Sequence, residues 1–164
     1  MTAAVARTDA SHPQRLRAPT PGAQAIAGSV FEWPVRVYWE DTDAGGIVFY
    51  ANYLKFFERA RTEWLRSLGI DQQALRESAG GIFVVSEANL RYHRPARLDD
   101  QLCVSARVQE AGRASLTFAQ QAHLIHTPDQ RPLLLCEGTV RVGWVDATHL
   151  RPSRLPAHIL EVLK

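Results

Sequence analysis

The sequence predicts one α+β domain in which a curved antiparallel β-sheet wraps around a single long helix. A helical period of apolar residues runs from Tyr53 to Leu68, and strand-like alternation marks one segment before it and four after it. A chain of 164 residues is long enough for one hydrophobic core and short for two. The helix is then the natural cover for the buried face of the sheet.

The first predicted strand precedes the helix. Val35, Val37 and Trp39 alternate with Arg36 and Tyr38, which is the period of a half-buried strand. An acidic stretch ends this strand and leads directly to the segment before the helix.

The helix itself is predicted from apolar residues at three- and four-residue spacing: Tyr53, Phe56, Phe57, Ala60, Trp64, Leu65 and Leu68. Charged side chains fill the other positions as far as Gly69, which gives a helix of about eighteen residues. Its aromatic side chains cover a wide arc, so a curled sheet buries more of them than a flat one, at about 25 cal/mol per Å². We expect Trp39, Trp64 and Trp144 to be core or subunit contacts.

Four consecutive antiparallel strands are expected after the helix, at residues 82–92, 102–110, 114–125 and 133–145. Turn-forming residues, among them Pro95, Gly112 and Pro128, separate these segments. Pro156, followed by apolar residues at helical spacing, predicts a short closing helix. The open edges of such a sheet need partners, so we expect oligomerisation by edge pairing.

Residues 1–30 are expected to form a disordered N-terminal tail, and residues 31–164 the folded domain. The tail shows neither a helical nor a strand period and no apolar core of a signal peptide. Its arginines suggest an organellar transit peptide as an alternative, but Pro13, Pro19 and Pro21 would interrupt an amphipathic helix.

Composition excludes several classes of function. The net charge of +2 comes from scattered arginines, so we expect neither a nucleic-acid nor a membrane footprint. No apolar stretch has transmembrane length.

The two cysteines, Cys103 and Cys136, lack metal-binding or disulfide spacing, and we expect a reduced, cytoplasmic protein. His123 and His126 are expected on opposite faces of a strand, which argues against a shared metal.

The stretch DTDAGGIVFYANY, residues 41–53, carries the candidate chemistry. A helix start presents unpaired N–H groups and a partial positive charge, which stabilise an oxyanion or a phosphate. Gly45 and Gly46 let a ligand approach the main chain, and Asn52 is suited to cap or orient the turn. A carboxylate such as Asp43, facing an oxyanion site, is what acyl hydrolysis requires.

Two other interpretations stay open at this point. Asp-Thr-Asp before Gly-Gly is also an ordinary strand-to-helix turn, in which the carboxylates accept backbone N–H groups. Glu40, Asp41 and Asp43 are also a possible metal site, although the spacing lacks the glycine and terminal glutamate of an EF-hand.

A longer stretch, RVYWEDTDAGGIVFYANYLKFFERARTEWLRSLG, resembles the hotdog-fold acyl-CoA thioesterases of the 4-hydroxybenzoyl-CoA thioesterase type. It is most similar to the tol-pal-associated acyl-CoA thioesterases of bacteria. The resemblance continues through FVVSEANLRYHRPARLDDQL and RASLTFAQQ and covers nearly everything after residue 33. It implies a sheet wrapped around a long helix, and subunits joined edge to edge as a homodimer or homotetramer.

The resemblance also implies residue roles. The second aspartate of the motif, Asp43, is the catalytic carboxylate, and the backbone N–H of Tyr50 is the oxyanion donor. Asp41 is a supporting residue. Tol-pal-type members often carry histidine at the position of Tyr50, so an imidazole role is not implied here, whereas a main-chain donor survives the exchange. Asp43 acts either as nucleophile or as general base on water.

Substrate-binding positions follow from the same resemblance and from arginine chemistry. Gly45 and Gly46 are expected to line the site. Arg113 matches a phosphate-contacting residue, because arginine holds phosphate through charge-assisted hydrogen bonds, and Ser115 matches a pocket position. Arg94 and Arg97 are further phosphate candidates, and surface solvation is the alternative for both.

The expected activity is hydrolysis of an acyl-CoA thioester to free acid and coenzyme A. No metal and no separate cofactor are expected, because coenzyme A is part of the substrate. Acyl-acyl carrier protein is an alternative substrate, which would make the carrier protein a partner. A hotdog subunit that binds acyl groups as a scaffold, without turnover, is the alternative from another class of function.

Overall fold

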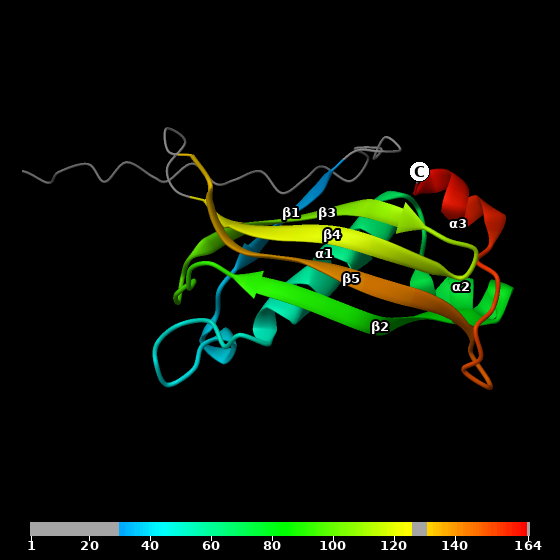
Figure 1. Ribbon diagram of the computed structural model, residues 1–164, viewed down its shortest axis with the longest axis horizontal. Helices are drawn as coiled ribbons and strands as arrows, with labels where there is room; N and C mark the ends of the chain where they lie inside the picture. The colour runs from blue at the N-terminus through cyan, green and yellow to red at the C-terminus, as the bar shows by residue number, and fades with distance from the viewer. Residues whose placement is uncertain (1–29, 126–130, 164) are drawn as a thin grey trace, which may run out of the picture.

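The computed structural model describes residues 30–125 and 131–163. It contains one five-stranded antiparallel sheet with strand order β1-β3-β4-β5-β2 (Figure 1). The strands are β1 (Phe31–Arg36), β2 (Gly81–Tyr92), β3 (Gln101–Ala111), β4 (Ser115–Leu124) and β5 (Leu133–Asp146). The helical segments are η1 (Trp39–Asp41), α1 (Asn52–Ser67), α2 (Gln72–Ala79) and α3 (Ala157–Val162).

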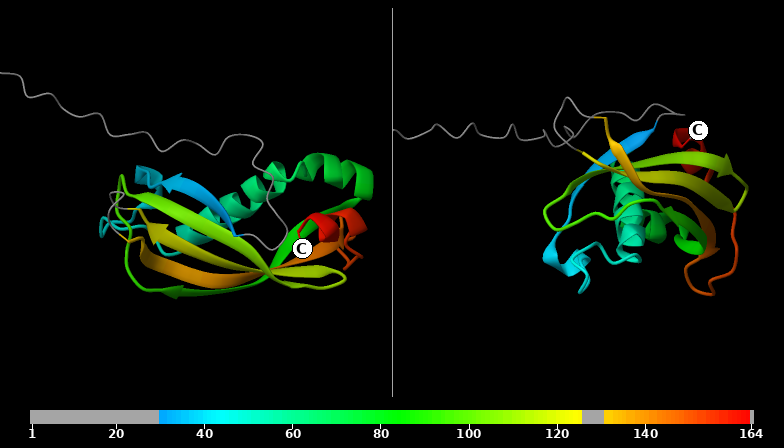
Figure 2. Two further views of the ribbon diagram at one scale, coloured as in Figure 1. Left: turned by 90° about the horizontal axis from the view of Figure 1, so that it is seen from above. Right: turned by 60° about the vertical axis from the view of Figure 1, so that its left-hand side comes forward.

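The sheet curves around α1, as Figure 2 shows, and the predicted α+β hotdog fold is confirmed. The four strands predicted after the helix agree with β2 to β5 within one residue at every end. The expectation that they pair consecutively is wrong for the first of them. The β2 strand pairs with β5 rather than β3, because the β3–β4–β5 meander is inserted beside β1 and carries β2 to the far edge.

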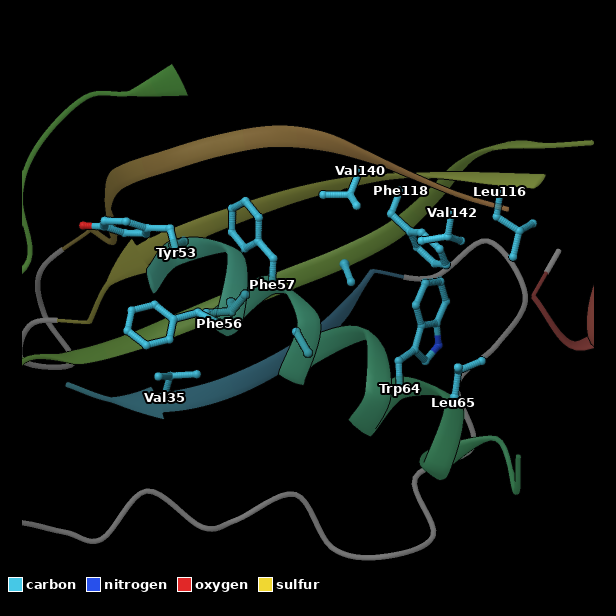
Figure 3. Packing of buried hydrophobic residues seen from close by; sticks show 14 of the residues in the cluster. Val35, Tyr53, Phe56, Phe57, Trp64, Leu65, Leu116, Phe118, Val140 and Val142 are labelled. Carbon is cyan, nitrogen blue, oxygen red and sulfur yellow. The ribbon is translucent and has the colours of Figure 1, made fainter. Parts of the chain in front are cut away.

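The core lies between α1 and the concave face of the sheet (Figure 3). Phe56 and Phe57 of α1 are fully buried, and Trp64 stacks against Phe31 of β1 and meets Phe118 of β4 edge-on. The predicted apolar face of the helix is therefore the buried face, and Trp64 and Trp144 are core residues. Trp39 is not in the core of this chain: it lies in η1 and is 78% exposed, because η1 ends the strand alternation that would have turned it inward.

Two elements differ from the predicted ones around α1. The helix has 16 residues rather than about eighteen. The short helix α2 was not predicted, although its sequence signals are present. The Asp71 side chain caps it by accepting the N–H of Ala74 at 2.8 Å, and Gly80 ends it with a left-handed φ of 65°.

The two edges of the sheet differ in their capacity to pair with another chain. The β1 edge is short, with six residues, and contains Pro34, which lacks a backbone donor. The β2 edge has 12 residues and no proline. The β2 strand is therefore the edge suited to pairing.

Gly138 of β5 offers a stability test for the β2–β5 pairing. A Cβ atom at this position would lie 2.2 Å from the backbone oxygen of Asn89 in β2. We expect Gly138→Ala to lower the free energy of unfolding by about 1–3 kcal/mol, as overpacking does, in urea denaturation. Gly143→Ala in the same strand is the control, because its Cβ would meet no atom closer than 3.9 Å. Equal effects of the two substitutions would contradict the steric argument.

The predicted tail, apart from Val30, lies outside the described residues. Deletion of residues 2–29 is expected to leave the thermal midpoint of unfolding and the activity unchanged, because a segment without periodic apolar residues contributes little buried surface. Differential scanning calorimetry and an activity assay of the shortened chain check this. A marked fall in the midpoint would mean that the tail packs on the domain.

Candidate active site

The motif forms a hydrogen-bonded loop between η1 and α1. The N–H of Asp43 donates to the carbonyl of Ile47 at 2.9 Å, and the N–H of Gly46 donates back to the carbonyl of Asp43 at 2.9 Å. Gly46 has a φ of 72°, which favours glycine. The loop is joined to the chain after β2 by a bond of 2.9 Å from the Val48 N–H to the Ala96 carbonyl.

The Asp43 carboxylate lies on the exposed surface of this loop. Its Oδ1 atom accepts the N–H of Gly45 at 2.8 Å, which is an Asx-type turn. A Cβ at Gly45 would lie 3.0 Å from the same oxygen, so glycine leaves room for the carboxylate there. The Oδ2 atom has no protein donor among the described residues, which leaves it available to react.

Asp41, by contrast, is 1% exposed and holds the loop in place. Its Oδ2 atom accepts the N–H of Tyr38 at 2.9 Å, and its carbonyl accepts the N–H of Phe49 at 2.8 Å. The Asn52 side chain donates to the Asp41 carbonyl at 3.1 Å. Of the two roles predicted for Asn52, this hydrogen bond fits the orientation of the turn. Asn52 does not cap α1, because the N-cap residue of that helix is Ala51.

The start of α1 is satisfied only in part by the main chain: the N–H groups of Asn52 and Leu54 donate to the carbonyls of Phe49 and Ala51 at 2.8 and 3.1 Å. No side chain caps this helix and no acidic residue lies in its first turn, so its partial positive charge is not compensated locally. Within the described residues, no acceptor is bonded to the N–H of Tyr50, two residues before the helix. Tyr50 is 62% exposed as a residue, so it lies on the surface of the loop, as Asp43 does.

Tyr92, at the end of β2, is a site residue that the motif did not reveal. Its hydroxyl donates to the carbonyl of Tyr50 at 3.1 Å, and its ring contacts those of Tyr50 and Tyr53 edge-on. Burial, followed by the neighbouring Cys136 and Tyr50, raises the pKa of Tyr92 above its ordinary value, so the hydroxyl keeps its proton at neutral pH. The antiparallel return of β2 creates this contact, 42 residues along the chain.

Within one chain the structure does not bring Arg113 and Ser115 to the motif. They lie at the β3–β4 turn, whereas the motif follows β1, beside the start of β3, where the Val37 N–H donates to Asp100. These points are at opposite ends of the sheet (Figure 1), separated by roughly 30 Å of strand. Arg113 is exposed, and Ser115 accepts a bond of 3.4 Å from Arg141.

Arg97 does lie beside the motif, since its backbone pairs with Ile47 in an isolated bridge. Arg94 precedes it by three residues, and both side chains are exposed. The phosphate candidates nearest to Asp43 in the same chain are therefore this arginine pair.

The described side chains form neither a metal-binding cluster nor a reactive thiolate. The Asp41 carboxylate is turned toward the Tyr38 N–H and away from a shared site with Asp43. In the part of the chain that the structure describes, no three His, Cys, Asp or Glu side chains converge as metal ligands. His126 lies outside the described residues. Burial raises the pKa of Cys103 to about 11 and that of Cys136 to about 12, so neither is a reactive thiolate. No helix in the described ranges is long and apolar enough to cross a membrane.

Comparison with known proteins identifies the family of the domain. Residues 45–127 match the Thioesterase superfamily. The acyl-CoA thioesterase YbgC of Haemophilus influenzae is 43% identical over 129 residues, which are 79% of this chain and 90% of that protein. The acyl-CoA thioester hydrolase YbgC of Escherichia coli is 42% identical over 136 residues, which are 83% of this chain and 97% of that protein.

Solved structures agree with the fold. A structure of 4-hydroxybenzoyl CoA thioesterase, complexed with 4-hydroxybenzoyl CoA, superposes with a TM-score of 0.76 at 20% identity and covers 82% of this chain and 99% of that one. An Aquifex aeolicus protein superposes with a TM-score of 0.72 at 30% identity, over 82% of this chain and 99% of that one. The chain therefore belongs to the thioesterase superfamily of hotdog-fold enzymes and, within it, to the YbgC family of acyl-CoA thioester hydrolases.

Proposed function

We propose that this enzyme hydrolyses acyl-CoA thioesters to a free acid and coenzyme A, with Asp43 as the catalytic carboxylate and the Tyr50 N–H as the oxyanion donor. The observation that carries the proposal is the pairing of two groups in one short loop: an exposed carboxylate with a free oxygen and an unbonded N–H at an uncapped helix start. The named activity of the YbgC relatives supports the choice of substrate.

Both forms of the mechanism balance without a metal or cofactor. As nucleophile, a carboxylate oxygen of Asp43 attacks the thioester carbon, and the carbonyl oxygen becomes an oxyanion held by the Tyr50 N–H. The C–S bond then breaks, the thiolate leaves, and water hydrolyses the mixed anhydride. As general base, Asp43 takes a proton from water, whose oxygen attacks the same carbon, and coenzyme A leaves as before.

Turnover in oxygen-labelled water separates these two routes. Label found in the Asp43 carboxylate after repeated turnover indicates the anhydride, because water then attacks the enzyme-derived carbonyl. Label found only in the product acid supports the general base, provided that hydroxylamine traps no acyl-enzyme, because water attack on the acyl carbonyl of an anhydride would also label the product alone. The proposal as a whole is tested by free-thiol release from a panel of acyl-CoAs, with the matching acyl-acyl carrier proteins as the alternative carrier. Absence of thiol release from every substrate would favour a scaffold without turnover.

Assembly is part of the proposal. Arg113 and Ser115 are roughly 30 Å from Asp43 along one chain, so they can serve the same substrate only across subunits. The open β2 edge is the means of bringing a second copy there. We propose a homodimer through β2, which can pair further into a tetramer.

Tyr92→Phe is expected to lower kcat by about two- to tenfold, because one hydrogen bond to the Tyr50 carbonyl, worth roughly 0.5–1.5 kcal/mol, is lost. The thermal midpoint should change little, since Tyr92 is 47% exposed. Steady-state kinetics and calorimetry on the same preparation check both values. Unchanged kcat would mean that the Tyr50 peptide is held well enough without Tyr92.

A further inference from the structure

A second candidate binding site lies away from the motif, between the later turns of α1 and the concave face of the sheet. It is a cavity of about 110 Å³. Its apolar wall consists of Leu65, Phe83, Val85, Leu116, Phe118 and Val142. Its polar groups come from Glu58, Arg61 and Thr62 of α1 and from Gln72 of α2. We call it the Arg61 cavity.

The guanidinium of Arg61 is half-buried and is fixed at the wall of this cavity. Its Nη1 atom donates to Oε1 of Gln120 at 2.6 Å. Gln120, in β4, is 1% exposed, and its own amide donates to the carbonyl of Phe57 at 3.0 Å. A buried amide, fixed at both ends, therefore fixes the position of the arginine.

Arg61 carries a positive charge that no carboxylate compensates in an ion pair, as far as the described residues extend. A guanidinium has five N–H donors, and one of them is bonded within the described residues. Burial lowers the pKa of Arg61 from its ordinary value, and the charge of nearby Glu58 opposes this effect only in part, so on balance the surroundings disfavour the charge. A bound anion would use the free donors and compensate that charge.

Glu58 is the other charged group at the cavity, and it is engaged at the rim. Its Oε1 atom accepts the hydroxyl of Thr62 at 2.7 Å, and that hydroxyl accepts the amide of Gln72 at 3.1 Å. Glu58 is exposed, so its charge is screened by water more than that of Arg61. The negative charge of Glu58 would nevertheless weaken the binding of an anion. Removal of this charge should therefore leave anion affinity unchanged or raise it.

We propose that the Arg61 cavity is a binding site for a carboxylate carried on a short apolar group. Arg61 would hold the carboxylate by charge-assisted hydrogen bonds, and the wall around Phe118 and Val142 would bury the apolar part. The volume of about 110 Å³ suits a small ligand, because an apolar cavity of about 150 Å³ already holds a benzene molecule.

Such a carboxylate has two sources, and the second rests on the proposed function. One is a free carboxylic acid, the kind of product that thioester hydrolysis releases. The other is the distal carboxylate of a dicarboxylic acyl group. Arg61 lies about 14 Å along α1 from Asn52, too far for a short acyl group at Asp43 of the same subunit. The acyl group would have to enter from the neighbouring subunit.

Calorimetric titration tests the site independently of turnover. The ligand is butyrate, and butyramide and butylamine are its neutral and cationic analogues. We expect butyrate alone to bind the full-length protein. Arg61→Gln should weaken butyrate at least tenfold, and Glu58→Gln should leave it equal or tighter. Arg66→Gln is the control, an exposed arginine of the same helix that pairs with Glu63 at 2.5 Å. Failure of butyrate to bind, or equal binding to Arg61→Gln, would overturn the proposal.

Gln72→Trp keeps the test valid if Arg61→Gln does not fold. Gln72 is an exposed residue of α2 at the rim of the cavity, outside the β2 edge, so a large side chain there should block butyrate without disturbing the core or the proposed dimer. Unimpaired binding to folded Gln72→Trp would overturn the location.

Glutaryl-CoA and pentanoyl-CoA, which have equal chain length, distinguish the sources. A preference for glutaryl-CoA that Arg61→Gln abolishes assigns the cavity to the acyl group. Equal rates, with butyrate inhibition that Arg61→Gln relieves, assign it to the free acid. Hydrolysis of pentanoyl-CoA by the unaltered enzyme reports separately on the proposed function.

Discussion

Asp43→Asn is expected to lower kcat for acyl-CoA hydrolysis by about a hundredfold or more, the scale of general acid–base catalysis, while the fold is retained. The amide removes both the nucleophile and the base. It keeps an oxygen that can accept the Gly45 N–H, the bond of 2.8 Å that shapes the turn. Free-thiol release under saturating substrate, with the thermal midpoint measured in parallel, checks the expectation.

Asp41→Asn is the matched control, two residues away in the same loop. Its buried side chain accepts the Tyr38 N–H, a role that an amide oxygen can also fill. We therefore expect Asp41→Asn to lower the thermal midpoint and to leave kcat nearly unchanged. Retained turnover in Asp43→Asn together with loss in Asp41→Asn would transfer the catalytic role to Asp41.

Much of the fold was predictable because single periods dominate its elements. The apolar spacing on α1 could be read directly, since every buried position serves one core. The position of β2 could not, because strand order depends on which partners bury most surface, and alternation within a strand does not encode its neighbour. Trp39 was misplaced for a local reason: η1 replaces the last part of the predicted strand.

Some residues of the candidate sites could be predicted from the sequence, and others could not. Asp43, Gly45, Gly46 and Tyr50 lie within eight residues of one another in the sequence, so the motif alone places them in one loop. Tyr92 and Arg61 were missed because their significance comes from contacts across the fold. Tyr92 contacts Tyr50, and Arg61 contacts Gln120, 59 residues away. Side chains that act through tertiary contacts give no spacing signal in one sequence.

The active form is expected to be at least a dimer, and dissociation should remove activity. The β2 strand ends at Tyr92, beside the motif, and begins at Gly81, at the end of the sheet that holds the β3–β4 turn (Figure 1). Antiparallel pairing of two β2 edges about a two-fold axis brings unlike ends together. The motif of one subunit then approaches the Arg113 end of its partner. Sedimentation and kinetics at matched concentrations check this, and a fully active monomer would contradict it.

Mixed dimers test the shared site directly. Consider a dimer of one Asp43→Asn chain and one Arg113→Ala chain. If each active site takes Asp43 from one subunit and Arg113 from the other, one of the two active sites carries both substitutions and the other carries neither. One fully competent site per mixed dimer should therefore appear after co-refolding, although each parent dimer is impaired. If Asp43 and Arg113 of one chain served the same site, every site in the mixture would carry one defect, and no activity above the parents' average would return. The Arg113→Ala parent must show a raised KM for acyl-CoA, because loss of a phosphate contact weakens substrate binding. An unchanged KM would remove Arg113 from the site and leave the two-fold β2 pairing to be judged by sedimentation.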